Sequence, residues 1–287
     1  MLAIDQLTVT YPHQTHPALH HLSLAIEGSA CVLGPSGAGK STLFKALIGL
    51  VQPRLGGMWL DGSRLNGRPI KARRQIAYVP QENALPGEST LSEYLMELAQ
   101  LDRFPQPHQS KAVKNIVELV HLSGALKKRM KWLSGGMKRR ALIAGALLRD
   151  TPWLLMDEPT LGLDPDEQAS IRALIRQLCR HRHVILATQF VEDAGTIPER
   201  LIILRQGHIL TETNWESLGK AAQGHIVLQP PIPSLTTPPL FWTPLRGNQG
   251  VRAFMIHPPQ DAPLLEPRPE DGYLWLVKTA QEPHHDG

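Results

Sequence analysis

A glycine-rich run of residues, GPSGAGKS at Gly34–Ser41, has the composition and spacing of a phosphate-binding loop. In such a loop backbone N–H groups surround phosphate oxygens, the Lys40 ammonium reaches the β and γ phosphates, and the Ser41 hydroxyl can bind Mg²⁺. The apolar segment 30–33 precedes the loop, and apolar residues at helical spacing follow it. Because a strand, a glycine loop and a helix stand in the order that phosphate binding requires, we favour this interpretation over a glycine turn without a ligand.

A pair of neighbouring acids, Asp157 and Glu158, stands at the end of the apolar run LLMDEP. A buried strand would carry Asp157 into the coordination sphere of the magnesium ion and place Glu158 next to the γ-phosphate. The pair could instead only cap the N-terminus of a helix. Lys40 and Ser41 upstream make metal binding the stronger hypothesis.

The segment LSGGM at Leu133–Met137 opens a predicted helix with several basic residues. The free N–H groups at the helix N-terminus and the Ser134 hydroxyl can together bind an anion. The alternative is a Ser-Gly helix cap without a ligand, which would imply no partner molecule.

In chain order, the phosphate loop, Gln81, LSGGM and LLMDEP resemble the motif series of ABC-type ATPases, and LSGGM is particular to that family. The resemblance covers residues 1 to about 215. It implies that ATP and Mg²⁺ are bound between two cassettes, with LSGGM of one chain closing over the ATP of the other. Met137 and the basic residues after it resemble the drug, antibiotic and lipid exporter branch.

The resemblance also assigns roles to individual residues. It implies catalytic roles for Lys40, Glu158 and Gln189. It implies contacts with ATP for Tyr11, Gly34, Pro35, Ser36, Gly37, Ala38, Gly39, Lys40, Ser41, Thr42, Gln81, Ser134, Gly135 and Gly136. It implies metal contacts for Ser41, Gln81 and Asp157.

Three of these roles depend on family positions. Tyr11 matches an aromatic residue that stacks on adenine, although a tyrosine on a surface strand is the alternative. Gln81 resembles the glutamine that contacts magnesium and the attacking water and senses the transmembrane subunit. Asp164, in GLDP, resembles the residue that signals across the dimer.

Gln189 departs from the family pattern. After the predicted strand 184–188 the family has a histidine that contacts the γ-phosphate, and this chain has Gln189 within ATQFVEDA. A glutamine side chain can donate a hydrogen bond but cannot carry charge. Either hydrolysis persists with Glu158 polarising water, or the cassette turns over slowly.

Alternating strand and helix patterns predict the fold class: an α/β phosphate-loop NTPase core with an antiparallel β layer, an inserted helical subdomain and a small C-terminal appendage. Strands are expected at 2–11, 20–28, 30–33, 57–62, 76–81, 153–156 and 184–188, with a hairpin of 201–204 and 208–210. Helices are expected at 40–50, within 89–124, at 134–148 and at 166–180. The helical subdomain is expected at about 89–140.

Composition changes after Gly219, because the segment from Ala222 onward holds 12 of the 25 prolines of the chain. We therefore divide the chain into a cassette at 1–219 and a Pro-rich C-terminal accessory region at 220–287. Segments 224–228, 251–256 and 273–277 are long enough to be strands. Residues 269–274 resemble the closing segment of many exporter-branch ATPases.

The composition, with 42% hydrophobic and 20% charged residues, is that of an ordinary soluble protein. No apolar run approaches the roughly 20 residues that a membrane-spanning helix needs. Cys31 and Cys179 fit neither a disulfide framework nor a zinc site, so inert packing is expected. The net charge of +4 is mostly dispersed, with clusters at 71–74 and 127–140, and no nucleic-acid partner is expected.

Together these features predict the ATP-binding and ATP-hydrolysing subunit of an ABC transporter, an exporter, at the cytoplasmic face of the membrane. The expected partners are a transmembrane permease subunit and a second cassette, identical or different. The alternative is an ABC-type ATP switch outside transport, in translation or DNA repair, with slow or no hydrolysis. Such switches usually carry two cassettes in one chain or a long coiled-coil insertion, and neither is seen in the sequence.

Overall fold

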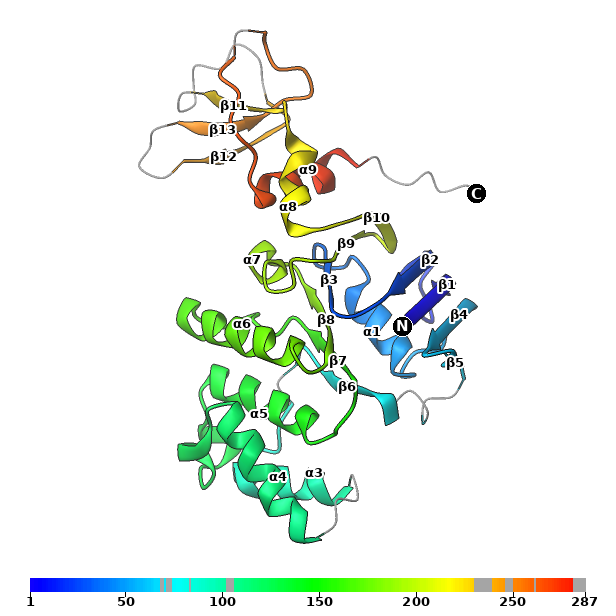
Figure 1. The fold of residues 1–287 in the computed structure, drawn as a ribbon. Helices are drawn as coiled ribbons and strands as arrows, with labels where there is room; N and C mark the ends of the chain where they lie inside the picture. Colours follow the sequence, from blue (N-terminus) through cyan, green and yellow to red (C-terminus); the bar gives the residue numbers. More distant parts are fainter. Residues whose placement is uncertain are drawn as a thin grey trace. The chain divides into compact units, whose positions relative to one another are not determined.

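The computed structural model describes residues 1–67, 70, 74–82, 84–101, 106–229, 239–245, 250–260 and 262–280, and the structural statements below concern these residues. The chain forms two compact units, Met1–Ile209 and Leu210–Gly287 (Figure 1). The predicted division at Gly219 stays a prediction.

A six-stranded sheet forms the centre of the first unit. Its order is β10-β9-β3-β8-β7-β6. The strands are β3 (Ala30–Leu33), β6 (Ile76–Val79), β7 (Trp153–Asp157), β8 (His183–Thr188), β9 (Leu201–Arg205) and β10 (His208–Thr213). Strands β9, β3, β8, β7 and β6 are parallel to one another, and every residue of β3 and β7 is buried. Parallel strands covered on both faces require such continuous apolar runs, which is why the sequence identified them.

A second, antiparallel sheet has the order β2-β1-β4-β5. Its strands are β1 (Leu2–Val9), β2 (Leu19–Ile26), β4 (Leu55–Leu60) and β5 (Ser63–Arg64). Side chains from this sheet, from α1 (Lys40–Leu47) and from the central sheet share one hydrophobic core, in which Phe44 and Trp153 are nearly inaccessible to solvent. The predicted antiparallel layer is confirmed.

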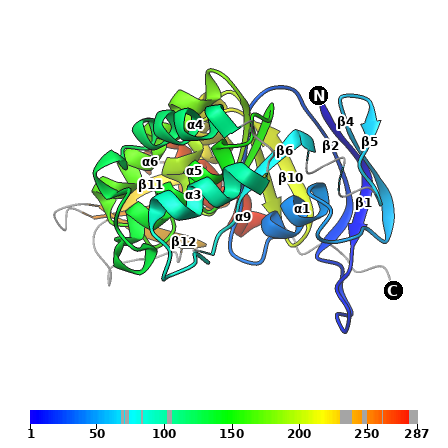
Figure 2. The same cartoon turned by 90° about the horizontal axis from the view of Figure 1, so that it is seen from below.

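Helices dominate the chain between β6 and β7. They are α3 (Leu91–Leu101), α4 (Gln106–Leu119), the 3-10 turns η1 (Ser123–Ala125) and η2 (Met130–Trp132), and α5 (Gly135–Leu147). After β7 follow α6 (Pro165–Cys179) and, after β8, α7 (Val191–Ala194). Figure 2 shows α3 to α6 on one side of the first unit and the antiparallel sheet on the other. The inserted helical region expected from the sequence is thus confirmed.

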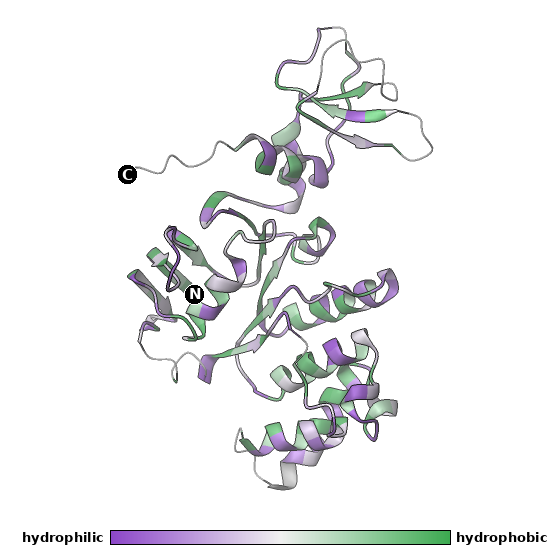
Figure 3. Cartoon of the chain, turned by 180° about the vertical axis from the view of Figure 1, so that it is seen from behind, coloured by the Kyte–Doolittle hydropathy of each residue, from purple (hydrophilic) through white to green (hydrophobic). Residues whose placement is uncertain are grey.

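Amphipathic patterning explains the helix packing. Helix α3 buries Leu91, Leu95 and Ala99 on one face, at spacings of four residues. In Figure 3 the strands of the central sheet are mostly green, whereas the helices alternate green and purple. Within the described part of the chain, no helix is both long and apolar enough to cross a membrane.

A two-residue turn joins β9 and β10. Gln206 and Gly207 have φ angles of 47° and 78°, as in the type I′ turns that match the twist of hairpin strands. The predicted hairpin around Gln206 and Gly207 is confirmed.

The second unit contains a three-stranded sheet and a helix. Its elements are α8 (Trp215–Leu218), the 3-10 turn η3 (Gly219–Ala222), β11 (Ile226–Gln229), β12 (Phe241–Pro244), β13 (Val251–Phe254) and α9 (Pro269–Thr279), with the sheet order β11-β13-β12. Two of the three expected strands are present, as β11 and β13. The third expectation, a strand at 273–277, is wrong because these residues lie in α9. Pro269 in its first turn and the Asp271 carboxylate, which accepts from the Arg268 N–H at 2.8 Å, both favour a helix start.

Candidate functional site

The phosphate loop connects β3 to α1, as the sequence predicts. Gly34 is needed for close approach, because a Cβ there would lie 2.1 Å from the Leu204 carbonyl oxygen. Gly39 has φ 104° and is the N-cap residue of α1, and because glycine has no side chain, no side-chain oxygen accepts from the N–H groups of the first turn. The backbone N–H groups in the first turn of α1 can therefore donate hydrogen bonds to an anion.

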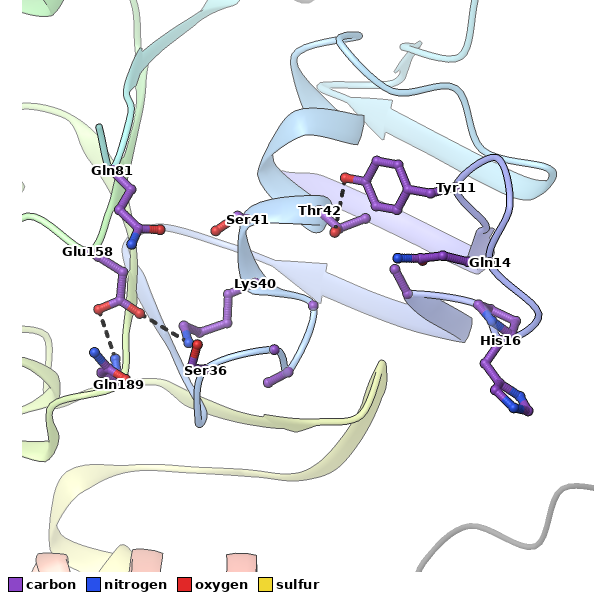
Figure 4. Close-up of a pocket in the computed structure, with 15 residues that line it drawn as sticks. Tyr11, Gln14, His16, Ser36, Lys40, Ser41, Thr42, Gln81, Glu158 and Gln189 are labelled. Carbon is purple, nitrogen blue, oxygen red and sulfur yellow. Dashed lines mark hydrogen bonds and ion pairs between the residues drawn. The ribbon is translucent and has the colours of Figure 1, made fainter. Parts of the chain in front are cut away.

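Lys40 is buried at the base of this loop, with 5% of its side chain exposed. Its ammonium donates to the Gly34 oxygen at 2.8 Å and the Pro35 oxygen at 3.0 Å, and it pairs with Glu158 Oε1 at 3.1 Å (Figure 4). A phosphate that enters the loop would compete with Glu158 for the same ammonium.

Glu158 follows the last residue of β7 and has a left-handed backbone, with φ 46°. Its own N–H bonds the Ala187 oxygen at 2.8 Å, and its Oε2 accepts from the Gln189 N–H at 3.1 Å. Burial raises the pKa of its carboxyl, while Lys40 acts in the opposite direction. A non-glycine residue held at this φ angle is strained, and such strain is typical of functional positions.

Asp157 ends β7 and is almost fully buried. Its Oδ2 accepts from the Tyr78 hydroxyl at 3.2 Å, whereas its Oδ1 has no hydrogen-bond partner among the described residues. Burial raises the pKa of this carboxyl, and a hydrogen bond from Ser41 opposes that rise. An unpaired, buried carboxylate oxygen beside a serine hydroxyl is a donor set that suits a hard divalent cation.

One cavity brings most of the predicted nucleotide residues together (Figure 4). The predicted residues that line it are Tyr11, Ser36, Gly37, Ala38, Gly39, Lys40, Ser41, Thr42, Gln81, Glu158 and Gln189. Gly34, Pro35 and Asp157 support it, the first two through their carbonyl bonds to Lys40. The Tyr11 hydroxyl lies 3.2 Å from Thr42 Oγ1, which joins the β1–β2 loop to α1.

Four lining residues were not singled out from the sequence: Gln14, His16, Pro17 and Ala18. They belong to the loop between β1 and β2, rich in His and Pro, that follows Tyr11. The role beside adenine that the family resemblance implies for Tyr11 could have pointed to this loop.

The Ser134 segment does not line this cavity in the single chain. Ser134 caps α5: its hydroxyl oxygen accepts from the Met137 N–H at 3.2 Å and its hydroxyl donates to Glu167 Oε1 at 3.3 Å. A Cβ at Gly136 would lie 2.2 Å from the Glu167 carboxylate, so a larger residue there would displace the Glu167 side chain. Asp164 caps α6 by accepting from the Glu167 N–H at 2.8 Å.

The sequence also did not indicate a buried hydrogen-bond network around Asp193, next to the site. The fully buried Asp193 accepts from the hydroxyls of Thr160 and Thr188, the latter at 2.9 Å, and pairs with Arg172 Nε at 2.7 Å. It joins the segment after β7, which carries Glu158, to the end of β8, which precedes Gln189. The contacts of Asp193 with Thr160 and Arg172 span 33 and 21 residues, so no local sequence pattern predicts them.

The parallel sheet, the glycine loop at the start of α1 and the buried carboxylates define the chain as a phosphate-loop nucleotide-binding protein. The sequence profile described as ABC transporter matches residues 19–161. The ABC transporter ATP-binding protein YxlF of Bacillus subtilis is 32% identical over 79% of this chain and 75% of its own length. The Nod factor export ATP-binding protein I of Rhizobium sp. (strain N33) is 35% identical over 74% of this chain and 70% of its own.

The Nod factor export ATP-binding protein I of Rhizobium meliloti is 34% identical over 74% of this chain, which spans 64% of the length of that relative. Among solved structures, a dimeric post-hydrolysis state of the ATP-binding cassette MJ0796 bound to ADP and Pi has a TM-score of 0.68 at 26% identity, covering 75% of this chain and 98% of that one. CbiO1 of Clostridium perfringens, part of the ABC transporter complex cbiONQ, also has a TM-score of 0.68 at 26% identity, covering 74% and 88%.

The chain belongs to the ABC transporter ATP-binding family. Proteins of this family bind ATP and are ATPases that work with transmembrane components. The family and fold class expected from the sequence are therefore confirmed, whereas the roles of the individual site residues stay predictions.

Proposed function

We propose that this chain hydrolyses ATP as the nucleotide-binding subunit of an exporter and drives a separate transmembrane subunit through ATP-dependent pairing of two cassettes. The observation that carries the proposal is the buried Lys40–Glu158 pair at the base of the phosphate loop. It places a phosphate-binding cation and a carboxylate base within 3.1 Å of each other.

In the proposed reaction, a γ-phosphate takes the place of Glu158 beside Lys40. Released from Lys40, the Glu158 carboxylate orients water and accepts its proton. Lys40 and the N–H groups of the loop stabilise the charge that develops on the phosphate oxygens. Gln189, whose N–H already bonds Glu158, positions the water or the γ-phosphate by hydrogen bonding.

Magnesium is proposed to be held by the unpaired Oδ1 of Asp157, the Ser41 hydroxyl and the Gln81 side chain. When bound, Mg²⁺ would neutralise negative charge on the β and γ oxygens. Asp157 and Ser41 suit this role because they combine a buried carboxylate oxygen with a neighbouring hydroxyl.

The second cassette is proposed to face the Ser134 segment. Ser134 and the α5 N-terminus form an anion site that a partner's γ-phosphate can fill once Glu167 gives way. Dimeric solved cassettes of the same fold support this arrangement.

The membrane subunit is proposed to dock in a mostly apolar groove next to Gln81. The groove is lined by Ile48, Leu50, Ile76, Ala77, Tyr78, Pro80, Tyr94, Leu98, Leu142, Gly145, Ala146 and Arg149, from the end of α1, β6, α3 and α5. An amphipathic helix from the cytoplasmic side of a permease has the chemistry to fill it. The chain would then lie at the cytoplasmic face of the membrane. Export as the direction rests on the similarity to Nod factor export proteins.

Gln189 favours a second candidate function, an ATP-binding switch with slow or no hydrolysis. Its amide can hold a phosphate oxygen but cannot carry the charge available to a histidine.

The pairing step can be tested by light scattering after gel filtration. Glu158→Gln, which keeps the shape of the side chain but removes the base, should form a dimer when ATP is added. Ser134→Arg in this background should remain a monomer that binds ATP. Ser123→Arg, which adds the same charge at an exposed position, is the control. An ATP-induced dimer of the Ser134→Arg variant would refute the sandwich arrangement.

A further inference from the structure

A buried arginine joins α5 to the chain segment that carries Gln81. Arg139 lies one turn into α5, with only 1% of its surface exposed. Its Nη1 donates to the Pro80 oxygen and its Nη2 to the Gln81 oxygen, both at 2.7 Å. Burying a guanidinium is costly, and charge-assisted bonds of this length are what offset the cost.

The hydrogen-bonding groups of the Arg139 guanidinium are only partly paired. Its Nε is buried without a hydrogen-bond partner among the described residues. Burial lowers the pKa of the guanidinium, and the carboxylates of Asp157 and Glu158 oppose this shift. The Arg139 side chain therefore lies in the electrostatic field of the site as well as on the carbonyls beside Gln81.

Arg139 joins two parts of the chain, α5 and the segment with Gln81, that have different proposed binding partners. Helix α5 starts at the Ser134 cap, which faces the second cassette in the proposed function. Gln81 follows the end of β6 and lines the nucleotide cavity. Helix α5 and Gln81 are linked directly by the Arg139 guanidinium.

Resting on the proposed function, we infer that Arg139 is the positioning residue that fixes the backbone at Gln81 and transmits movements of α5 to the Gln81 side chain. The inference gives Arg139 no contact with ATP. It acts by holding the Gln81 carbonyl, so that the Gln81 amide stays directed at the metal and water side of the cavity. An arginine suits this task because its planar fork reaches two carbonyls at once, whereas a lysine donates from one point.

Arg182 offers a matched control. Its Nη1 donates to the Arg149 oxygen at 2.8 Å and the Thr151 oxygen at 3.2 Å, and so it also bridges two carbonyls, at the far end of α5. None of these residues lines the nucleotide cavity.

The test compares the wild type with Arg139→Met, Arg139→Lys and Arg182→Met. For each protein, fluorescent ATP binding is measured in EDTA, and the Mg²⁺ dependence of binding and the kcat of hydrolysis are then measured. Arg139→Met should keep wild-type affinity in EDTA, need more Mg²⁺ for half-maximal effect, and lose kcat about ten- to hundredfold. The Mg²⁺ requirement and kcat of Arg139→Lys should lie between those of Arg139→Met and the wild type. Arg182→Met should match the wild type in both quantities.

A double-mutant cycle separates positioning from a merely structural role. In a Gln81→Ala background, Arg139→Met should lower kcat less than about twofold further, because both changes act through the same side chain. If the effects of Arg139→Met and Gln81→Ala on kcat were fully additive, the inference would be overturned. Wild-type Mg²⁺ dependence in Arg139→Met would also overturn it. If Arg139→Met does not fold, wild-type kcat and Mg²⁺ dependence in Arg139→Lys would overturn it as well.

Lys40→Ala in the same assays keeps the two proposals apart. It should weaken ATP binding at least about tenfold even in EDTA, and this result tests the proposed nucleotide site whatever the Arg139 variants do.

Discussion

At the scale of single residues, the site is held by pairing between groups that are expected to separate when nucleotide binds. The Lys40 ammonium donates to two carbonyl oxygens and pairs with Glu158. The pairing keeps two buried charges from standing alone, which would destabilise the fold. It also leaves each of them close to its proposed partner in the reaction.

We predict that Lys40→Ala weakens ATP binding at least about tenfold, because hydrogen bonds to charged groups contribute about 1.5–3 kcal/mol. Titration with a fluorescent ATP analogue measures the effect. Lys114→Ala, at an exposed position on α4, should bind as the wild type does. Unchanged affinity in Lys40→Ala would contradict the assignment of the loop.

The pH dependence of hydrolysis should report on Glu158. Burial raises the pKa of its carboxyl above the ordinary value of 4.5. The base is active only when deprotonated, so kcat/KM should fall as the pH drops through this raised pKa, and the loss should begin above pH 4.5. A pH–rate profile that stays flat down to an ordinary carboxyl pKa would show that Glu158 is not the base.

At the scale of elements, the sequence was informative where local patterns decide the structure. Residues 30–33 of β3 and 153–156 of β7 are unbroken apolar runs, and the glycine loop has its own spacing, so the strands and the loop could be predicted. Segment 273–277 is an apolar run long enough for a strand, but the Pro269 and Asp271 start signals favour the helix in which it lies.

The Asp193 network and the Arg139 contact could not be predicted from the sequence. Thr160 and Arg172 lie 33 and 21 residues from Asp193, and Pro80 and Gln81 lie 59 and 58 residues from Arg139, so only the tertiary fold brings these groups together.

Asp193→Asn tests whether the Asp193 network stabilises the ends of β7 and β8, which carry Glu158 and Gln189. The change leaves Arg172 without its carboxylate and places an amide donor among hydroxyls that now donate to Asp193. We expect a loss of about 2–3 kcal/mol in the free energy of unfolding and a lower kcat with unchanged ATP affinity. Urea unfolding and steady-state assays measure these quantities. Asp150→Asn, with a side chain 99% exposed, should change neither, and equal behaviour of the two variants would count against the network.

At the scale of the whole molecule, the cavity proposed to bind nucleotide lies within the first unit. The second unit has its own small cores and a buried Arg252–Asp271 pair at 2.6 Å. A cassette cut after Gly219 should therefore stay soluble and bind ATP.

Helix α9 packs tightly on α8, because a Cβ at Gly272 would lie 1.8 Å from the Leu218 oxygen. A cut after Gly219 would leave α8 without this neighbour, so a second fragment that ends at Thr213 removes α8 as well. Gel filtration and ATP titration would decide, and insolubility of both fragments would show that the second unit is needed for folding.

The central claim is that this chain turns over Mg-ATP with Glu158 as its base although Gln189 stands where the family has histidine. Phosphate release by purified protein, with and without its membrane partner, tests this claim most directly when wild type, Glu158→Gln and Gln189→His are compared. We predict modest turnover in the wild type, none above background in Glu158→Gln, and equal or higher turnover in Gln189→His. If the wild type releases no more phosphate than Glu158→Gln even with its partner, the chain is an ATP-binding switch and the account of hydrolysis is wrong.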